Sequence, residues 1–434
     1  MSFVHSNSCD CSKTELELFS LPPTQTHIET GEWVLYKPVS SLSETSPIEF
    51  CVAGAGSQYI DLSQTLLHVK AKIVKTDGTA RAAADDNKVG PVNNWMHSLF
   101  SQVDVWLNQR IVSSPSNAYP YRSYIENLLN YGPAAKKSHL SSIIWERDTP
   151  GSMEVANNAG LTARCAFTNR GKTVDMMGNI HADIFNSEKY LPNNVELRVK
   201  LVRSRDEFCL LGEEDCKVSI LEANLYVRRV KVSPSVLLTH AKNFEKTSAK
   251  FPITRVDVKT HTISAGVQSG SLDNIVNGQL PTRIIVGMVS NGAFTGGFAS
   301  NPFNFQTFDL NYAAFHVDGQ PIPGLILTPD FDSDEYIRAY HTLFSGTGIH
   351  YSDSGNEISR DDYKKGYTLI ALDFTPDLEA HIKSHWSLVR HGSVRLELRF
   401  KKALPSSVTV ITYAEFDNII EIDNDRNVAV DFGA

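Results

Sequence analysis

Two histidines four residues apart, His381 and His385, have the spacing that most readily suggests chemistry in this chain. On an α-helix this spacing places both imidazoles on one face, where they could bind zinc. A zinc protease also needs a glutamate directly after the first histidine, and this chain has Ile382 there. The segment 375–390 begins with threonine and proline, which favour a helix start, so we expect a helix but no metal catalysis.

Other motifs that could do chemistry are each incomplete. The segment 330–334 reads Asp-Phe-Asp-Ser-Asp, like the start of a calcium loop, but the central glycine and closing glutamate are missing. Gly171 opens a Gly-Lys-Thr triplet, but Ala166 replaces the first glycine of a phosphate-binding loop. Segment 54–56 lacks the third glycine of a dinucleotide fingerprint. We therefore predict that the protein is not an enzyme and has no cofactor. Two carboxylates for sugar hydrolysis could still come from positions far apart in the chain, so this alternative stays open.

Charge and cysteine usage exclude further classes. The formal net charge of −8 argues against specific nucleic-acid binding, which needs a clustered positive surface. All the cysteines lie in the first half of the chain. Their number is too small for a secreted protein that is stabilised by disulfides. We expect reduced thiols at these positions and no metal site at the first pair: Cys9, Cys11, Cys51, Cys165, Cys209 and Cys216.

Neither targeting nor membrane insertion is indicated by the sequence. Residues 1–10 have no basic start and no hydrophobic core, so they do not resemble a secretory signal. No apolar run approaches the ~20 residues that cross a bilayer. We expect a protein made inside the cell and not secreted through a signal peptide.

The elements that position these residues occur twice, in the same order. An alternating strand at 103–108, a polar loop and a helix at 121–131 are followed by a second strand at 312–318, another loop and a helix at 334–344. In this alignment Asn108 matches Asp318. Further alternating strands end each half, at 195–202 and 218–227 in the first and at 394–400 and 408–416 in the second. This repeated order of elements predicts two tandem β domains with a boundary between about 231 and 251.

Both predicted helices carry an apolar stripe at i, i+3, i+4 spacing. The first contains Tyr121, Tyr124, Ile125, Leu128 and Leu129, and the second contains Tyr336, Ile337, Tyr340, Leu343 and Phe344. A Gly-Pro pair at 132–133 and a glycine at 346 should end them. We expect each helix to bury its stripe on its own sandwich or against a neighbouring subunit, with plain core packing for most of these residues.

Many short strands separated by turn residues favour a sandwich or jelly roll. We predict an all-β fold of two tandem eight-stranded antiparallel jelly rolls with short helices in the loops. The units are an extended arm at 1–27, a first jelly roll at 28–235 and a second at 236–434. Three such chains would present six similar modules around a three-fold axis, which is a physical reason for duplication in a shell protein.

Three segments carry a resemblance to a known family. Segments 98–112 and 119–132 resemble the signature of the major capsid proteins of Polinton/Maverick elements and adintoviruses, and 189–199 is similar to a strand entry in these proteins and their virophage relatives. The resemblance implies a double jelly-roll hexon in the virion that forms a homotrimer with a pseudohexagonal outline. It also implies an icosahedral shell around a DNA genome, with neighbouring capsomers and a single jelly-roll penton protein as partners. Contact with a membrane stays open.

Shell proteins of this kind act through interfaces, so we expect no catalytic, cofactor or metal residues. The residues expected to serve folding or trimer packing are Trp106, Tyr121, Tyr124, Leu128, Tyr336 and Tyr340. The arm, rich in Ser and Thr with Pro22-Pro23, would tie neighbouring capsomers together or face the shell interior. The alternatives are a carbohydrate-binding or carbohydrate-active β-sandwich and a receptor-binding spike.

Overall fold

The computed structural model describes residues 6–9, 11, 13–154, 157–382 and 384–431. Its first half contains two four-stranded antiparallel sheets. One has the order β1 (Ile28–Tyr36), β10 (Cys216–Val232), β3 (Gln58–Lys75) and β7 (Val174–Asn179). The other has the order β2 (Ile48–Val52), β8 (Leu197–Arg203), β5 (Phe100–Leu107) and β6 (Arg110–Ile111). A short pair, β4 (Val89–Pro91) and β9 (Leu210–Gly212), lies beside them.

The second half repeats this arrangement. One sheet has the order β11 (Ala249–Ile263), β18 (Val408–Ile422), β13 (Arg283–Ser290) and β16 (Leu369–Asp373), with β19 (Val428–Asp431) paired to β18. The other has the order β12 (Ser269–Gln279), β17 (His391–Phe400), β14 (Leu310–Val317) and β15 (Gln320–Leu327). If the eight main strands of each half are numbered along the chain, both halves pair them as 1-8-3-6 and 2-7-4-5. The predicted fold of two tandem jelly rolls is therefore confirmed.

The repeat extends to single hydrogen bonds. Asn108 and Gln109 turn β5 into β6 with φ of 43° and 70°, and Asp318 and Gly319 turn β14 into β15 with φ of 49° and 78°. Two positive φ values match the tight hairpin turn that suits twisted strands. The Asn108 side chain accepts from the backbone N–H of Glu196 at 2.7 Å, and the aligned Asp318 accepts from Ser393 at 2.8 Å. Each turn is thus tied to the strand beside it in the same way.

Each sandwich has a core made by alternation along its strands. In β8, every second side chain is fully buried: Leu197, Val199 and Leu201. In β17 the same role falls to Val394, Leu396 and Leu398. The period of two places these residues between the two sheets of each half and leaves the charged residues between them facing outward.

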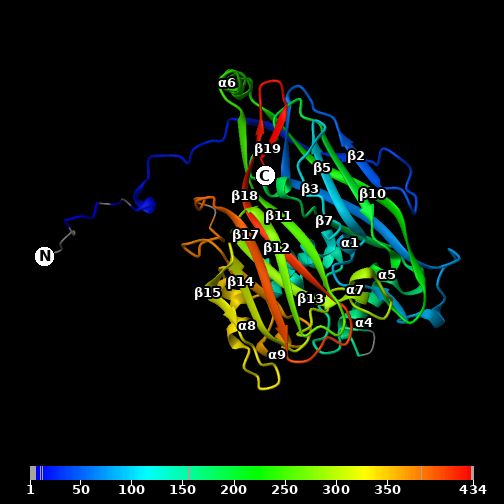
Figure 1. Ribbon diagram of the computed structural model, residues 1–434. Coiled ribbons are helices and arrows are strands. Elements are labelled where there is room, and N and C mark those ends of the chain that lie inside the picture. Colours follow the sequence, from blue (N-terminus) through cyan, green and yellow to red (C-terminus); the bar gives the residue numbers. More distant parts are fainter. Residues whose placement is uncertain (1–5, 10, 12, 155–156, 383, 432–434) are drawn as a thin grey trace.

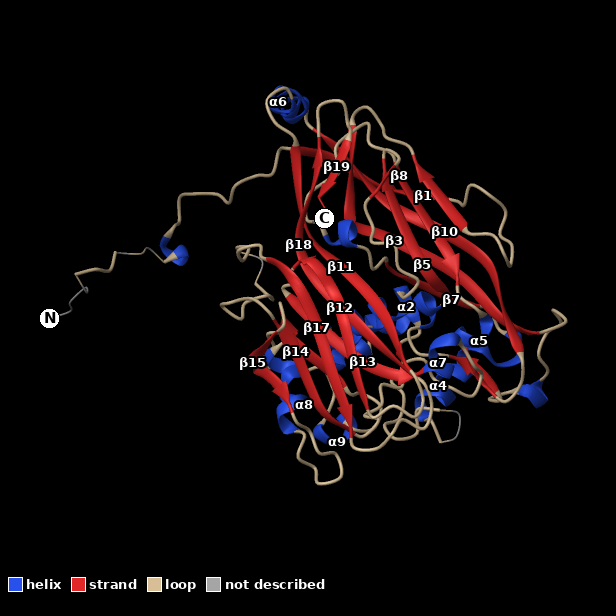
Figure 2. Cartoon of the chain, in the orientation of Figure 1, coloured by secondary structure: helices blue, strands red, loops and turns tan. Residues whose placement is uncertain are grey.

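Most helices gather between the two strand groups and at one end of the molecule, whereas α6 lies alone at the other end (Figures 1 and 2). The first half contains α1 (Trp95–Ser98), α2 (Tyr119–Asn130), α3 (Pro133–Lys136), α4 (Ala159–Thr168) and α5 (Asp206–Cys209). After α6 (Pro234–Phe244) come α7 (Asn291–Thr295), α8 (Ile337–Ser345) and α9 (Arg360–Tyr363). The two predicted aromatic helices are confirmed as α2 and α8, which end before Gly132 and at Gly346.

The helix predicted over 375–390 is wrong, because the described residues of this segment form turns. The carboxylate of Asp373 accepts from the backbone N–H groups of Thr375 at 2.8 Å and Ala380 at 3.0 Å. Leu378 has a φ of 59°, which no right-handed helix allows. A nearby side-chain acceptor has therefore captured the backbone donors that a helix would use.

The arm and the helix α6 between the two jelly rolls lie at the same end of the molecule (Figure 1). Residues 13–27 extend away from the body and are exposed. They form no strand, and one short 3-10 helix spans Thr14–Leu16 (Figure 1). The boundary expected between residues 235 and 236 falls inside α6, which joins β10 to β11. None of the helices in the described ranges combines the length and the apolar character that a membrane span requires.

Candidate functional site

The tyrosines of α2 lie where the two halves of the chain meet. Tyr124 stacks on Phe303 from the loop between β13 and β14, with ring centroids 4.1 Å apart and planes inclined by 2°. Tyr121 stacks on Phe294 at 5.9 Å and meets the edges of Phe303 and Phe305. Such aromatic pairs add to the stabilisation that burial itself provides. The stripe of α2 thus contacts the other half of its own chain, an arrangement that the sequence did not predict.

The hydroxyl groups of these two tyrosines contribute little polar contact. Tyr121 and Tyr124 are 1% and 0% exposed, and neither hydroxyl finds a hydrogen-bond partner among the described residues. Burial raises the pKa of both hydroxyls. Both side chains therefore act through the packing of their rings.

Leu128 completes the buried face of α2, being 1% exposed. Trp106 lies away from this helix on β5, where its side chain is half-buried beside the β5–β6 turn. The structure therefore brings together three of the six expected residues on α2 and places Trp106 elsewhere. Their roles in folding or trimer packing stay predictions.

The remaining two residues, Tyr336 and Tyr340, form a second aromatic cluster at α8. Tyr336 is buried, stacks on Phe331 at 5.2 Å and donates its hydroxyl to the carbonyl of Arg360 at 3.1 Å. Tyr340 is half-buried and donates to the carbonyl of Ile358 at 2.9 Å. The two hydroxyls hold the segment that leads into α9. Ile337, expected on the buried stripe, is instead 43% exposed, because the inner face of α8 centres on Ala339 and Leu343.

A buried ion pair of the first half accepts hydrogen bonds from the second half, and sequence reasoning missed it. Asp148 and Arg164 form a contact of 2.6 Å with both side chains fully buried. From the second half, the Asn301 amide donates to Asp148 at 3.0 Å, and the Tyr367 hydroxyl donates to its backbone carbonyl at 2.7 Å. No local pattern marks these residues, because their partners lie far away in the chain. The pair fixes the position of the α4 region against the second half.

A second charged cluster lies between α2 and the second half. Arg122 pairs with Glu126 at 2.9 Å and with Asp183 at 2.7 Å, and the Asp183 carboxylate accepts from the backbone N–H of Val256 in β11 at 3.1 Å. Burial by itself raises the pKa of Glu126, but Arg122 and His181 together lower it to about 2. Glu126 therefore stays ionised, and its charge is balanced inside the protein.

His97 should make the stability of this chain sensitive to mild acid. Its imidazole is buried in α1 and contacts the Tyr119 hydroxyl at 2.9 Å. Burial, with the charge of His181, lowers the pKa of His97 well below 6.5. Below about pH 6.5 the unfolded chain binds a proton that the folded chain does not, so the free energy of unfolding should fall as the pH drops.

Urea unfolding at about pH 7.5 and pH 5.5 would measure this loss. A His97→Asn chain should lose less stability between the two pH values than the wild-type chain does. The matched control is the exposed His350, whose change to asparagine should leave the pH dependence as it was. An equal acid loss in wild type and His97→Asn would contradict the prediction.

The candidate metal residues do not assemble as the sequence suggested. In the loop 374–390, Asp377, Glu379 and His385 place ligand atoms within 4.8 Å of one another, and His381 is not among them. All three are exposed or half-buried, and an ion pair of 3.0 Å between His385 and Asp377 accounts for the contact.

The calcium-like segment 330–334 has its charges balanced by lysines. Lys401 contacts Asp332 at 2.8 Å and Asp330 at 3.3 Å, and Lys364 pairs with Asp334. Asp330 also accepts from the backbone N–H groups of the turn that follows it. The segment is thus a hydrogen-bonded, lysine-paired turn.

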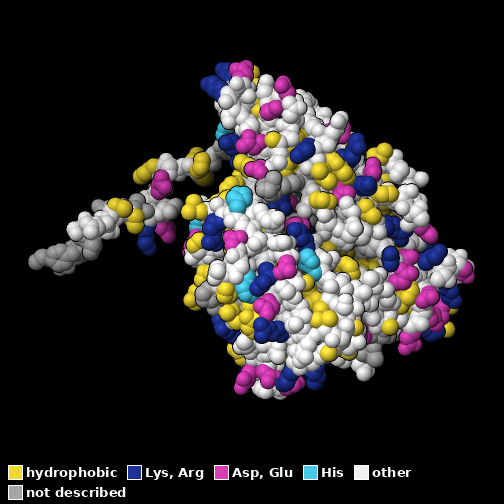
Figure 3. Space-filling view, viewed as in Figure 1, with side chains coloured by type: hydrophobic (Ala, Val, Ile, Leu, Met, Phe, Trp, Pro, Cys, Tyr) yellow, Lys and Arg dark blue, Asp and Glu magenta, His cyan; other side chains and the backbone are white. Residues whose placement is uncertain are grey.

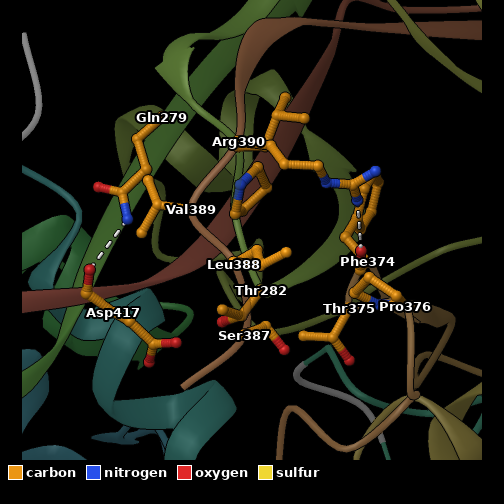
Figure 4. A pocket seen from close by; sticks show the side chains of 12 residues that line it. Gln279, Thr282, Phe374, Thr375, Pro376, Ser387, Leu388, Val389, Arg390 and Asp417 are labelled. Carbon is orange, nitrogen blue, oxygen red and sulfur yellow. Dashed lines mark hydrogen bonds between the residues drawn. The ribbon is translucent and has the colours of Figure 1, made fainter.

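The cavity beside the loop 374–390 is too small for a substrate. Figure 4 shows its lining, where Arg390 donates to the carbonyl of Phe374 at 3.1 Å and Gln279 donates to the carbonyl of Asp417 at 2.9 Å. Its volume is about 20 Å³, which is room for about one water molecule. This site does not offer the concave surface that a sugar-binding protein needs.

Comparisons with known proteins agree with the fold. No protein-family model matches the chain. An uncharacterized protein of Caenorhabditis elegans is 26% identical over 425 residues, which cover 95% of this chain and 99% of that protein. A chain in the structure of the Sputnik virophage superposes with a TM-score of 0.69 at 11% identity, covering 100% of this chain and 94% of that one.

Two solved major capsid proteins also match over nearly their full length. The mavirus protein has a TM-score of 0.53 at 12% identity and covers 99% of this chain and 97% of its own. The Faustovirus protein has a TM-score of 0.54 at 9% identity, with 94% and 92% covered. With its repeated strand order and a match that spans both halves, the chain has the double jelly-roll fold of viral major capsid proteins.

Proposed function

We propose that this chain is a viral major capsid protein, a hexon whose homotrimers build an icosahedral shell around a DNA genome. The observation that carries the proposal is the duplication itself: one chain holds two jelly rolls with the same strand order. Three chains around a three-fold axis present six similar modules, which fill a six-sided position in a lattice. The protein then acts as a structural component of the virion and not as an enzyme.

The contacts between the halves suit this role. The stack of Tyr124 on Phe303 and the link from Asp148 to Asn301 hold the two rolls in one fixed relation. A fixed relation lets each chain supply two neighbouring corners of the same hexagon. In this proposal the units are 28–235 and 236–434, the arm is 1–27, and the partners are neighbouring capsomers and a penton protein with a single jelly roll.

The origin of the shell is part of the same proposal. The segments at 98–112, 119–132 and 189–199 resemble capsid proteins of Polinton/Maverick elements and adintoviruses. A Caenorhabditis elegans protein matches this chain over 99% of its own length. This match supports an origin in an element that is carried in animal genomes. The chain is then the hexon of an integrated or recently active element of this kind.

The oligomeric state tests the proposed function. Light scattering coupled to gel filtration should give a mass of about three times 48.1 kDa. Negative-stain images of the same fraction should show particles with a six-sided outline. A monomer that binds glycans on an array would favour a lectin-like sandwich, and a monomer that binds cell surfaces would favour a spike; either result would overturn the proposal.

A further inference from the structure

An open groove lies under α6, at the end of the molecule from which the arm leaves. Its volume is about 560 Å³, within the range of pockets that bury a drug-sized ligand. Large apolar side chains line much of it: Ile28, Tyr59, Val232, Val236, Phe244 and Phe251. Not one residue of α6 is buried, although a helix gains most of its stability by packing an apolar face. Val236 and Leu237 of α6 are only partly buried against Tyr59, Val230 and Val232, so the inner face of α6 is incompletely covered.

Two lysines lie at the rim of this groove, and the Glu421 carboxylate accepts a hydrogen bond from Ser248 in its lining. Lys189 and Lys250 both line it, and the Lys189 ammonium donates to the backbone carbonyl of Lys250 at 2.8 Å. The ion pairs found within the described ranges include neither lysine. His27 and His240 also line the groove. An occupant of this groove should therefore be apolar with acidic residues beside its apolar side chains.

The arm of the chain has this composition. Its segment 14–21 exposes four large apolar side chains to solvent: Leu16 at 72%, Leu18 at 75%, Phe19 at 99% and Leu21 at 91%. The same segment contains Glu15 and Glu17 and no basic residue. Figure 3 shows apolar side chains along the arm, away from the body. Contiguous exposed apolar side chains of this kind mark an interaction site.

We propose that segment 14–21 of one copy binds in the groove under α6 of a second copy. The inference rests on the proposed function, since it assigns a contact between chains of the assembly. The acidic, apolar segment complements the groove in both charge and apolar character. Its side chains would cover the inner face of α6, and Glu15 and Glu17 would meet Lys189 and Lys250.

The exit of the arm favours a second copy over the same chain. The Gln25 side chain accepts from the backbone N–H of Ile28 at 2.8 Å and donates to its carbonyl at 3.3 Å, which fixes the direction in which the arm leaves the groove rim. Pro22-Pro23 then keeps the chain extended. A return to its own groove would need a reversal within residues 22–27, which these features oppose.

A labelled peptide of residues 13–23 tests the contact by fluorescence anisotropy with the full-length trimer at low concentration. We expect saturable binding that weakens at least tenfold when Val236 is changed to aspartate. Leu238, 65% exposed and outside the groove lining on the same helix, is the matched control, and Leu238→Asp should leave binding unchanged. A peptide carrying Phe19→Asp should not bind.

A charge exchange tests the rim without disturbing the apolar lining. Lys189→Glu with Lys250→Glu should weaken binding of the natural peptide, and a peptide with Glu15→Lys and Glu17→Lys should restore it. Absence of peptide binding to the wild-type trimer, or equal loss in the Val236 and Leu238 variants, would overturn the inference. If peptide binds only to a chain carrying Phe19→Asp, the arm occupies its own groove, and the second-copy assignment is wrong.

Mixing separates this inference from the proposed function. Trimers with Phe19→Asp have a defective arm and trimers with Val236→Asp a defective groove, and neither should associate further in light scattering. Their mixture should associate, because the arm of one can enter the groove of the other. Trimers that form normally but show no recovery on mixing contradict the arm contact alone, whereas wild-type chains that form no trimers contradict the proposed function.

Discussion

Replacing Asp148 by alanine should lower the free energy of unfolding by about 3–5 kcal/mol, because it leaves the charge of Arg164 buried and unpaired. Both side chains of the pair have zero exposure, so water cannot take the place of the lost carboxylate. The amide of Asn301 would lose an acceptor in the same step. Since whole domains are stable by only about 5–15 kcal/mol, this loss should remove a large part of the stability of the protein.

Urea unfolding of purified chains measures this loss, and two comparisons make it specific. Asp86→Ala removes a carboxylate from the surface pair with Arg170, whose side chain is 70% exposed, and should cost no more than about 1 kcal/mol. Asp148→Leu combined with Arg164→Met should recover part of the stability, because no unpaired charge stays buried, while Asn158 and Asn301 still lose an acceptor. Equal losses for Asp148→Ala and Asp86→Ala would contradict the prediction that burial makes the loss of this partner costly.

Replacing Tyr124 by alanine should cost about 3–5 kcal/mol, since it removes a fully buried ring and leaves a cavity at the contact between the halves. Tyr124→Asp should cost more, because it also buries a carboxylate without a partner. Tyr124→Phe should be nearly neutral, because the hydroxyl has no partner among the described residues. Unfolding experiments, with trimer mass measured in parallel, check the series.

Tyr340→Asp is expected to have a smaller effect than Tyr124→Asp. Tyr340 is half-buried, and its loss removes one hydrogen bond to the carbonyl of Ile358. The assembly role assigned to both tyrosines would be wrong if stability and trimer formation survived both aspartate substitutions unchanged. A Tyr124→Phe chain as unstable as Tyr124→Ala would show that the hydroxyl, and not the ring, holds the contact.

The parts of the fold that local patterns encode could be predicted from the sequence. Alternation along 103–108 and 312–318 identified β5 and β14, and the apolar spacing of Tyr121, Tyr124 and Leu128 identified α2. The match of the two halves also aligned the hairpin turns correctly. Strand period and helix period are properties of neighbouring residues, so a single sequence suffices to read them.

What the sequence could not supply is the partner of each side chain. The spacing that identified α2 says nothing about Phe303, which belongs to a loop in the other half. The helix predicted over 375–390 failed for a similar reason. Threonine and proline favour a helix start, but Asp373 lies close enough to bind the backbone of Thr375 and Ala380, and tertiary geometry overrides the local preference.

The stack of Tyr124 on Phe303 limits how far the two jelly rolls of one chain can move relative to each other. Sliding or hinging of one roll on the other would separate rings whose planes are inclined by only 2° and would expose the buried charges of Asp148 and Arg164. Each chain should therefore behave as a single rigid body. In a shell of the kind proposed, curvature would therefore arise at the contacts between chains and not within a chain.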